Sequence, residues 1–531
     1  MTDATTKRLT LIACILGSGI AFLDSTVVNV ALPAIRRDLG GGLTAQQWIV
    51  EAYLLTLGSM LLVGGSLGDL FGRRRVFSHG LAGFGATSLV CAVSPSPEVL
   101  VVARGLQGIA GALLVPSSLA MITAVFDAQE RGRAIGSWTA WTGVAMVVGP
   151  LGGGLLVDAA SWRWIFAINV PLVAVDLWLL RRVPESRDEE MVHRVDAGGA
   201  VLCALGLAGP VLALTEQPNR GRGDPLMIAP LLVGLVMLGA FVAHERRSDH
   251  PMLPLEIFRA RNFAVGNLAT FTIYGGLGVA TFFVTIFLQQ VADWSAVAAG
   301  LSLLPVTVIM WLLSSRFGAL SDRIGPRLLM GLGPMVGGLG LIWMGRLGAD
   351  PDYVSELLPG VVLFGLGLSA TVAPLTNTVL GAVAQHHAGV ASGANNAIAR
   401  VASLLAIAAV GAVVAGRYEA SLDSAVAGRA LDARERAALP VVRNRPLAGG
   451  ATQGPRLDAA VRDASVDAYR WGTGVGGALV IVGGGISLLG IVNPPRRRAA
   501  AVRERDLGAL RITHPCPHRR EGEEALPREA A

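Results

Sequence analysis

The ten residues at 65–74 are Gly-Ser-Leu-Gly-Asp-Leu-Phe-Gly-Arg-Arg, and the ten at 318–327 are Gly-Ala-Leu-Ser-Asp-Arg-Ile-Gly-Pro-Arg. Gly, Leu, Asp, Gly and Arg occupy the same places in both copies, at a constant offset (318 − 65 = 253). The first copy follows the second long apolar run of the chain, and the second copy follows the tenth. The repeat therefore predicts two related halves, with two additional apolar runs near 197–215 and 227–243 between them.

Composition sets the class of protein around this repeat. Apolar residues make up 52% of the 531 residues and charged residues only 15%, whereas a soluble domain has about 25% charged residues. A helix that crosses a bilayer needs about 20 apolar residues, and long runs without alternation indicate helices. We therefore expect an all-α polytopic membrane protein with fourteen spans. The runs lie near 10–32, 48–68, 76–93, 98–122, 134–156, 164–181, 197–215, 227–243, 263–289, 297–315, 327–346, 357–378, 398–416 and 471–492.

The charged residues and cysteines exclude several classes of function. Lys7 is the only lysine, so the chain lacks the internal lysine that a Walker-type phosphate loop requires. We therefore do not expect this chain to drive transport with ATP. The arginines lie in short loops between apolar runs, so they indicate positive cytoplasmic loops rather than a nucleic-acid surface. Four cysteines, three of them in apolar runs, lack the spacing of a disulfide framework or a metal site. We expect no cofactor and no metal. The run after Lys7 is too long for a cleaved signal peptide and is expected to be the first span.

The distribution of basic residues predicts the orientation. With the N-terminus inside, the cytoplasmic segments before the tail contain 19 basic residues and the six short outer loops contain six. The positive-inside rule then places both termini in the cytoplasm. Two segments are not apolar enough to enter the membrane. We expect 417–470 to form an extracytoplasmic loop and 493–531 to form a disordered cytoplasmic tail.

Both copies of the repeat resemble the signature loop of the major facilitator superfamily. Further stretches resemble motifs of its fourteen-span drug:proton antiporters, the QacA/EmrB type: Asp24–Pro33 in the first run, Arg104–Gly108 in the fourth, Gly149–Gly153 in the fifth, and Trp162–Phe166 with Asn169–Pro171. The resemblance covers nearly all of 10–492. Two positions depart from it: Leu70 stands where the loop usually has Arg, and Ala145 stands where the fifth-run motif usually has Gly.

The resemblance implies a domain organisation and an activity. It implies a six-helix bundle at 1–181, two additional helices at 182–262, and a second six-helix bundle at 263–492. It also implies a proton-coupled antiporter in the cell membrane, functional as a monomer, that exports drugs, antibiotics or other lipophilic small molecules. Parallel repeats place the substrate site at their interface, near the middle of the bilayer. The alternatives are an importer or dedicated metabolite carrier of the same fold, and a polytopic membrane enzyme, for which the runs contain no catalytic set.

Three ionisable residues are candidates for proton coupling. Asp24 lies in the middle of the first run, where a carboxylate costs roughly 2.5–3.5 kcal/mol on insertion scales and is by default functional. Glu51 lies near the start of the second run, facing the outer vestibule or simply wetted at the interface. Arg104 is the only basic residue that we place within a span, and the resemblance implies that it controls protonation of a nearby carboxylate. The alternatives are a plain helix–helix hydrogen bond for Asp24 and a structural ion pair for Arg104. Asp176, near the inner end of the sixth run, is expected to be interfacial.

Polar residues in the runs and the repeated motifs supply the other candidates. Polar side chains expected to line the substrate cavity are Asn29, Gln107, Asn267 and Asn377. Residues expected to act as gates or conformational latches are Gly65, Asp69, Gly72, Arg73, Arg74, Gly149, Pro150, Gly153, Gly318, Asp322, Arg323, Gly325 and Arg327.

Overall fold

A computed structural model describes residues 3–186, 196–220, 224–248, 251–383, 388–427, 429, 431–443, 445–447 and 454–493. Within these ranges the regular secondary structure is helical, and no β-strand occurs. The residues up to Ile491 form one compact unit, to which all the helices of the described ranges belong. The predicted tail lies outside the described residues from residue 494 onward.

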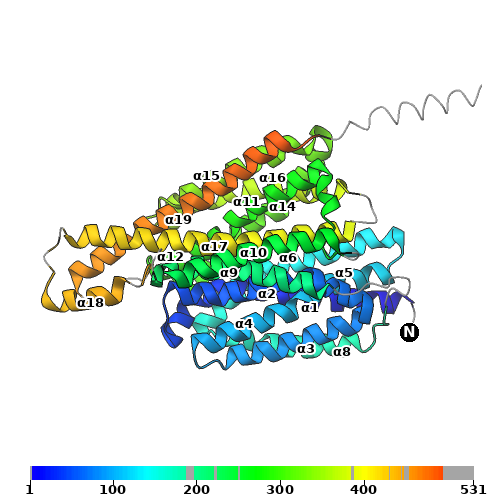
Figure 1. Ribbon diagram of the computed structural model, residues 1–531, viewed down its shortest axis with the longest axis horizontal. Coiled ribbons are helices and arrows are strands. Elements are labelled where there is room, and N and C mark those ends of the chain that lie inside the picture. Colours follow the sequence, from blue (N-terminus) through cyan, green and yellow to red (C-terminus); the bar gives the residue numbers. More distant parts are fainter. Residues whose placement is uncertain are drawn as a thin grey trace, which may run out of the picture. The chain divides into compact units, whose positions relative to one another are not determined.

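Eight helices precede the two additional runs and make up the N-terminal half (Figure 1). They are α1 (Asp3–Leu39), α2 (Leu43–Phe71), α3 (Arg73–Ala92), α4 (Pro97–Ala112), α5 (Leu114–Val125), α6 (Ala128–Ala159), α7 (Trp164–Ala167) and α8 (Asn169–Leu180). The additional runs form α9 (Ala197–Arg220) and α10 (Pro225–Arg247).

The C-terminal half begins after α10 and ends at the close of the compact unit. Its helical segments are η1 (Leu255–Arg259), α11 (Arg261–Val279), η2 (Ala280–Val284), α12 (Thr285–Gln290), α13 (Ala296–Ser302), α14 (Leu304–Ile324), α15 (Pro326–Met344), η3 (Tyr353–Leu357), α16 (Leu358–Gly381), α17 (Ala388–Ala427), α18 (Ala433–Arg443) and α19 (Pro455–Gly490).

Helical structure covers each of the fourteen apolar runs to within two residues at their ends. Ten helical segments in the described part of the chain are long and apolar enough to cross a membrane. Some runs contain more than one helix. The fourth run divides into α4 and α5 because Pro116 lacks an N–H and its ring clashes with the carbonyl of residue i−4, which is Ala112, the last residue of α4. The displaced carbonyl packs on Gly64 of α2, where a Cβ would lie 2.2 Å from the oxygen.

The repeated loop has the same backbone in both halves. Gly72 joins α2 to α3 with φ +103°, and Gly325 joins α14 to α15 with φ +92°. L-residues with side chains rarely adopt such angles, so both positions require glycine. The loop is therefore a single-residue break between two consecutive helices in each half.

The last arginine of each loop makes an equivalent contact. Nη1 of Arg74 donates to the carbonyl oxygen of Val183, just after α8, at 2.9 Å. Nε of Arg327, its counterpart in the repeat, donates to the carbonyl oxygen of Leu488 in the last turn of α19, at 2.5 Å. In both halves the loop thus fastens onto the end of the last helix of its own half. The repeat extends from sequence to tertiary contacts.

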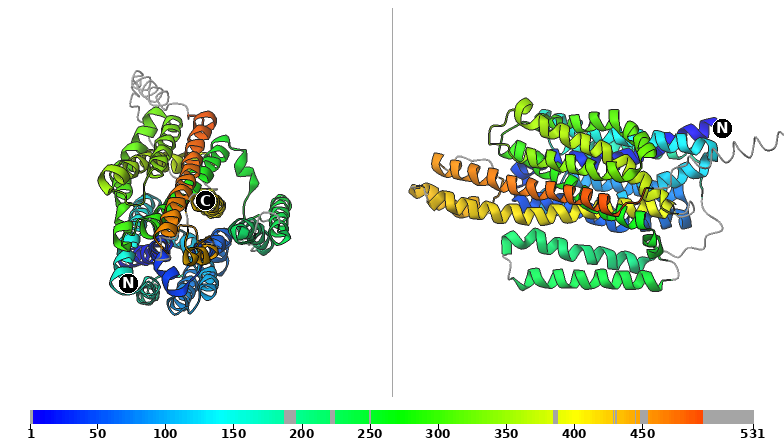
Figure 2. Two further views of the ribbon diagram at one scale, coloured as in Figure 1. Left: turned by 90° about the vertical axis from the view of Figure 1, so that its left-hand side faces the viewer. Right: turned by 90° about the horizontal axis from the view of Figure 1, so that it is seen from above.

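The additional helices α9 and α10 pack against each other as a closely spaced pair (Figure 2). A Cβ at Gly209 would lie 2.2 Å from the Pro230 oxygen, and one at Gly234 would lie 2.5 Å from Pro210. On its other side α9 packs on α2 and α17. The pair therefore packs on both halves mainly through α9.

The segment predicted as an extracytoplasmic loop at 417–470 is largely helical. Helix α17 continues to Ala427, α18 occupies Ala433–Arg443, and α19 already begins at Pro455. The buried Glu435 side chain accepts hydrogen bonds from the backbone N–H groups of Arg456 and Leu457 and so fastens α18 to α19. Hydropathy detects only the apolar part of a helix, so the sequence analysis did not detect these extensions.

Candidate functional site

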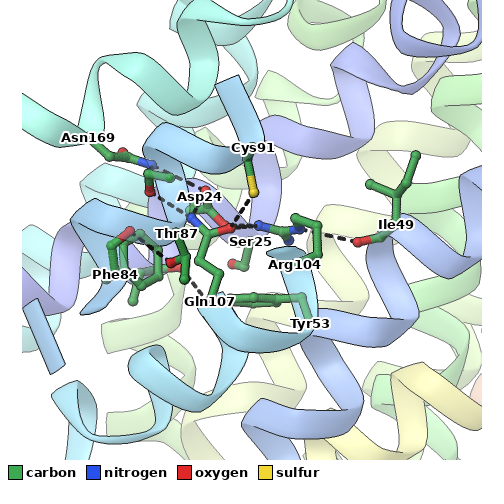
Figure 3. Close-up of polar contacts among 12 residues, drawn as sticks. Asp24, Ser25, Ile49, Tyr53, Phe84, Thr87, Cys91, Arg104, Gln107 and Asn169 are labelled. Carbon is green, nitrogen blue, oxygen red and sulfur yellow. Dashed lines mark hydrogen bonds and ion pairs between the residues drawn. The ribbon is translucent and has the colours of Figure 1, made fainter. Parts of the chain in front are cut away.

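The centre of the candidate site is an ion pair buried among the helices of the N-terminal half. Nη1 of Arg104 on α4 lies 2.5 Å from Oδ2 of Asp24 on α1, and the two side chains are 1% and 0% exposed (Figure 3). Eighty residues separate them in the sequence. The structure brings together the two residues that the sequence analysis singled out most strongly, and it makes them direct partners.

Neutral polar side chains surround this pair. Oδ1 of Asp24 accepts hydrogen bonds from Nε2 of Gln107 at 3.2 Å and Nδ2 of Asn169 at 3.3 Å. Both donors also contact the hydroxyl of Ser88 on α3. The carboxylate therefore has three donors from two further helices, which offset much of the cost of burying its charge.

The guanidinium of Arg104 is held on its other sides as well. It donates from Nη1 to Oε1 of Gln107 at 2.7 Å and from Nε to the carbonyl oxygen of Ile49 on α2 at 3.2 Å. Its Cζ lies 4.2 Å from the centre of the Tyr53 ring. Planar stacking with several in-plane donors is a geometry that lysine cannot reproduce. Asn169, Ser88 and Tyr53 were not among the predicted site residues. Asn169 was noted only as part of a motif, and nothing in the sequence pairs these three positions with Asp24 or Arg104.

Glu51 on α2 does not contact Asp24 or Arg104 directly; its polar contact is with the additional helix α9. Its side chain is fully buried and Oε2 accepts a hydrogen bond from the Thr215 hydroxyl of α9 at 2.7 Å. Three residues earlier on α2, Trp48 donates to Glu216 of α9 at 2.8 Å. The expectation that Glu51 is wetted from an outer vestibule is wrong for this conformation, because α9 covers it.

The predicted cavity-lining residues do not lie together. Gln107 belongs to the Asp24 cluster, whereas Asn267 on α11 accepts a hydrogen bond from Asn395 of α17 at 3.0 Å. Asn29 is half-buried, and its Oδ1 has no hydrogen-bond partner among the described residues. Asn377 is exposed on α16. The sequence showed that these side chains are polar, but it did not show toward which neighbouring helix or surface each side chain faces.

Arg400 is a further intramembrane arginine that the sequence analysis missed. It lies thirteen residues into α17, inside a segment long and apolar enough to span a membrane. The statement that Arg104 is the only basic residue within a span is therefore wrong. The Arg400 guanidinium lies 5.5 Å from the Phe22 ring centre of α1, so it crosses from the C-terminal to the N-terminal half. A pocket of about 10 Å³ beside it, lined in part by Tyr53 and Asn396, has room for about one water.

The first repeated loop is fixed by a residue outside the motif. The Glu185 carboxylate, after α8, accepts hydrogen bonds from the backbone N–H groups of Arg74 and Arg75 at 2.9 and 3.2 Å. It thereby caps the N-terminus of α3, where the helix dipole favours a negative charge. A Cβ on Gly72 would lie 2.8 Å from this carboxylate. Arg73 donates to the Ala120 carbonyl oxygen at 3.4 Å, and the side chain of Asp69 is outside those that the structure describes.

The remaining gating candidates lie in the second loop, in the helices that precede the two loops, and in α6. In the second loop, Asp322 and Arg323 are exposed, and Gly65 and Gly318 lie in the helices that precede each loop.

Helix α6, which carries the glycine–proline motif, joins the two halves. On one side, a Cβ at Gly149 would lie 2.4 Å from Thr26 and a Cβ at Gly153 would lie 2.1 Å from Val27, both on α1. On the other side, the Pro150 oxygen would lie 2.6 Å from a Cβ at Gly300 of α13. The glycines of the motif therefore allow close contact with α1, and Gly300 allows close contact with α13.

The same contact continues to the end of α6. The Asp158 carboxylate accepts hydrogen bonds from the backbone N–H groups of Ala296 at 3.3 Å and Val297 at 3.0 Å. A carboxylate at this helix start stabilises the junction of the two halves. The motif ends before Asp158, which is why the sequence analysis did not select it.

A larger cavity of about 820 Å³ lies between α2, α4, α9, α17 and the segment that carries α18. Glu98, Glu216 and Glu419 line it together with Trp48, and the lining also includes Arg443, which forms an ion pair with Asp423. This cavity lies at the ends of α2 and α4 where Gly42 and Pro97 are located, not beside Asp24.

Two helical halves that share a repeated loop, together with long apolar helices and a buried ion pair, are features of a membrane carrier. The model of the Major Facilitator Superfamily matches residues 14–407, so the chain belongs to this superfamily of transporters and is a multi-pass membrane protein.

Curated relatives of similar length carry names that refer to resistance and export. The puromycin resistance protein of Streptomyces alboniger is 37% identical over 411 residues, 76% of this chain and 81% of the relative. The multidrug resistance protein Stp of Mycobacterium tuberculosis is 35% identical over 422 residues, 79% of this chain and 78% of the relative. The tetracenomycin C resistance and export protein of Streptomyces glaucescens is 35% identical over 418 residues, 77% of this chain and 76% of the relative.

Solved structures share the fold at low sequence identity. A bacterial homologue of the human lysosomal transporter Spinster matches with a TM-score of 0.62 and 16% identity, over 92% of this chain and 99% of that one. A POT family peptide transporter matches with a TM-score of 0.62 and 16% identity, over 92% and 98% of the two chains.

Proposed function

We propose that this protein exports a lipophilic small molecule, of the antibiotic or drug class, in exchange for protons. The observation that carries the proposal is the buried Asp24–Arg104 pair in a major facilitator chain. A carboxylate inside a membrane protein is costly unless it is paired, and it can lose its charge by taking up a proton. The names of the relatives favour export of an antibiotic or drug over import.

The coupling step follows from the contacts of Asp24. When a proton binds one of its oxygens, the attraction to Arg104 is lost, and Arg104 keeps its charge under almost all conditions. The guanidinium must then find other partners, such as Oε1 of Gln107 or the Ile49 carbonyl oxygen, which it already contacts. Since these donors and acceptors come from α1, α2, α4 and α8, protonation changes how four helices of the N-terminal half are held together.

Alternating access requires the two halves to separate on one side and close on the other. In this conformation the halves meet through Asp158 with α13 and through Gln289 of α12, which donates to the Val30 carbonyl oxygen of α1 at 3.0 Å. Both contacts lie toward the ends of α1 and α6 nearest Leu39 and Ala159. With the N-terminus inside, these ends are extracytoplasmic, so the proposal assigns this conformation as closed on the outer side.

We also propose fourteen spans with the domain limits 1–181, 182–262, 263–492 and 493–531. Ten segments satisfy the composition expected of a span, and the remaining apolar runs lie in α2, α3, α6 and the α7–α8 pair. At 1.5 Å per residue, the 20 residues of α3 cover roughly the 30 Å of a bilayer core. Polar residues such as Arg75 and His79 lower the mean hydropathy of α3, which explains why this helix falls short on composition.

Gradient-driven transport tests the function. Purified protein is reconstituted into liposomes loaded with puromycin, and flux is followed after a pH jump, without nucleotide. We expect flux that follows the size and sign of the imposed pH gradient and that stops when a protonophore collapses it. Flux that needs ATP, or that ignores the gradient, would contradict proton coupling. If puromycin is not carried, ethidium and tetracycline are tested as further probes in the same vesicles.

Thiol labelling tests the orientation. In a background without the four cysteines, Ser424→Cys at the exposed end of α17 is expected to react with a membrane-impermeant thiol reagent in whole cells. Glu256→Cys, also exposed but in η1 between α10 and α11, is expected to react only after the cells are opened. The opposite pattern would reverse the orientation and the assignment of the closed side.

A further inference from the structure

A buried acid that the proposed coupling mechanism does not use lies in the N-terminal half. Asp176 on α8 is 0% exposed, and neither carboxylate oxygen has a hydrogen-bond partner among the described residues. This contradicts the expectation that Asp176 is an interfacial residue. Asp24 has an arginine and two amide donors, whereas Asp176 has nothing comparable within the described ranges.

Helix periodicity relates the two acids. Asn169, which donates to Asp24, and Asp176 are seven residues apart on α8, so they lie on one face of the helix, two turns or about 10.5 Å apart. On α1, Gly17 is seven residues before Asp24 and therefore lies two turns away on the same face. A Cβ at Gly17 would lie 2.6 Å from Oδ2 of Asp176. Two acids thus lie along one α1–α8 contact, one paired and one not.

The neighbours of Asp176 offer no compensating charge in the described part of the chain. α8 packs on α1, α3 and α7. From α1, the titratable group facing Asp176 is the buried thiol of Cys14, which is not a cation. From α3, Phe77 approaches the same place, whereas His79 is exposed and contacts the Arg75 carbonyl oxygen instead. α7 contains no titratable side chain.

The free-energy cost of burying each protonation state decides whether the Asp176 carboxyl is charged or neutral. An isolated carboxylate in such surroundings costs several kcal/mol, whereas an uncharged carboxyl without a partner costs about 1–3 kcal/mol. The neutral form, with a proton on one oxygen, therefore fits the surroundings of this conformation. An apolar side chain would carry no polar cost at all, so the presence of an acid indicates that its proton is used.

We propose that Asp176 is a second proton-binding site of this transporter, separate from the Asp24–Arg104 pair and two helical turns from it. In the conformation seen here Asp176 carries a proton. When α1, α3 and α8 shift and water reaches the carboxyl, its O–H bond breaks, the proton passes to water and a carboxylate remains; the reverse step forms the bond again. With the N-terminus inside, Asp176 lies on the cytoplasmic side of Asp24. Its use in the transport cycle rests on the proposed proton coupling; its protonation does not.

Infrared spectroscopy tests the protonation without any substrate. The reconstituted protein is measured at neutral pH in H₂O and D₂O, and Asp176→Asn is subtracted from the wild type. We expect the C=O stretch of a protonated carboxyl, shifted in D₂O, to be lost in Asp176→Asn. The matched control is Asp350→Asn, which changes an exposed aspartate between α15 and η3 and is expected to leave the band intact. If the wild type lacks the band, Asp176 is ionised and the proposal is wrong.

Transport stoichiometry tests whether the proton moves. Protons and puromycin are counted in the same vesicles, and Asp176→Asn is expected to move one proton fewer per molecule than the wild type. Loss of the infrared band with an unchanged proton count would show that the carboxyl is only structural and would overturn its role in the cycle. If the wild type ignores the pH gradient altogether, the proposed function fails, while the infrared band still decides whether Asp176 binds a proton.

A second variant distinguishes loss of the carboxyl from misfolding of the protein. Asp176→Val is apolar and adds less volume than leucine would, and an apolar side chain removes the cost of burying an unpartnered polar group. We expect Asp176→Val to have a Tm no lower than that of Asp176→Asn and to show the same lost band and the same proton count. A Tm of Asp176→Val well below that of Asp176→Asn would indicate that the carboxyl has a partner that the proposal denies.

Discussion

Export driven by a pH gradient is expected to fall to the level of protein-free liposomes when Asp24 is replaced by asparagine. Asparagine has the same size and keeps an oxygen that Gln107 and Asn169 can donate to, but it cannot take up a proton. If Asp24 is the carried acid, the variant reaches the membrane and binds puromycin yet does not couple its movement to protons. Flux after a pH jump and puromycin binding, measured on the same preparation, test this.

The interpretation of Asp24→Asn needs a control for the arginine that loses its counterion. In the double variant Asp24→Asn with Arg104→Gln, no unpaired charge remains in the cluster. We expect the double variant to regain stability lost in the single variant but not coupled transport. If Asp24 only joins helices, asparagine would replace it well. Wild-type flux with wild-type pH dependence in Asp24→Asn would therefore transfer the coupling role to another buried acid, Glu51 or Asp176.

Replacing Arg104 by alanine is expected to have the largest effect on stability. It leaves the Asp24 carboxylate buried without its cation, and breaking a buried pair in this way costs about 3–5 kcal/mol. Arg104→Lys keeps the charge but loses the planar fork that bonds Asp24, Gln107 and Ile49 together. We expect Tm and coupled flux to rank wild type above Arg104→Lys, and Arg104→Lys above Arg104→Ala.

A surface arginine provides the comparison. Arg462 lies 3.7 Å from Asp350, with the two side chains 43% and 87% exposed, and ion pairs at the surface contribute little. Arg462→Ala is therefore expected to behave as wild type in both measurements. If Arg104→Ala had the same Tm and coupled flux as Arg462→Ala, the Asp24–Arg104 pair would contribute nothing to stability or to coupling, and the proposed coupling mechanism would be wrong.

The repeated loop shows which structural features the internal sequence repeat predicted. Identity at five positions predicted two related halves, and the structure gives Gly72 and Gly325 the same positive φ and gives Arg74 and Arg327 equivalent carbonyl contacts. The carboxylate that caps α3, on Glu185, could not be found this way. It lies more than 100 residues from the loop and outside every motif.

The acids show the same limit more sharply. Asp24, Glu51 and Asp176 are all carboxylates in or near apolar runs, and the sequence ranked them by their depth in the run. Tertiary structure ranks them by partner: Asp24 has Arg104, Glu51 has Thr215 of the additional pair, and Asp176 has neither a cation nor a donor in the described part of the chain.

The sequence by itself determined the class of this protein, the positions of its apolar helices and the relation between its halves, because hydropathy and loop motifs are properties of consecutive residues. Only the tertiary structure decided which buried polar groups meet. A polar side chain acquires its partner from the rotation and tilt of its helix against helices far away in the chain, and packing across those distances sets both. Arg104 finds Asp24 across eighty residues, while Asp176, two turns along the same helix contact, is left without a partner among the described residues.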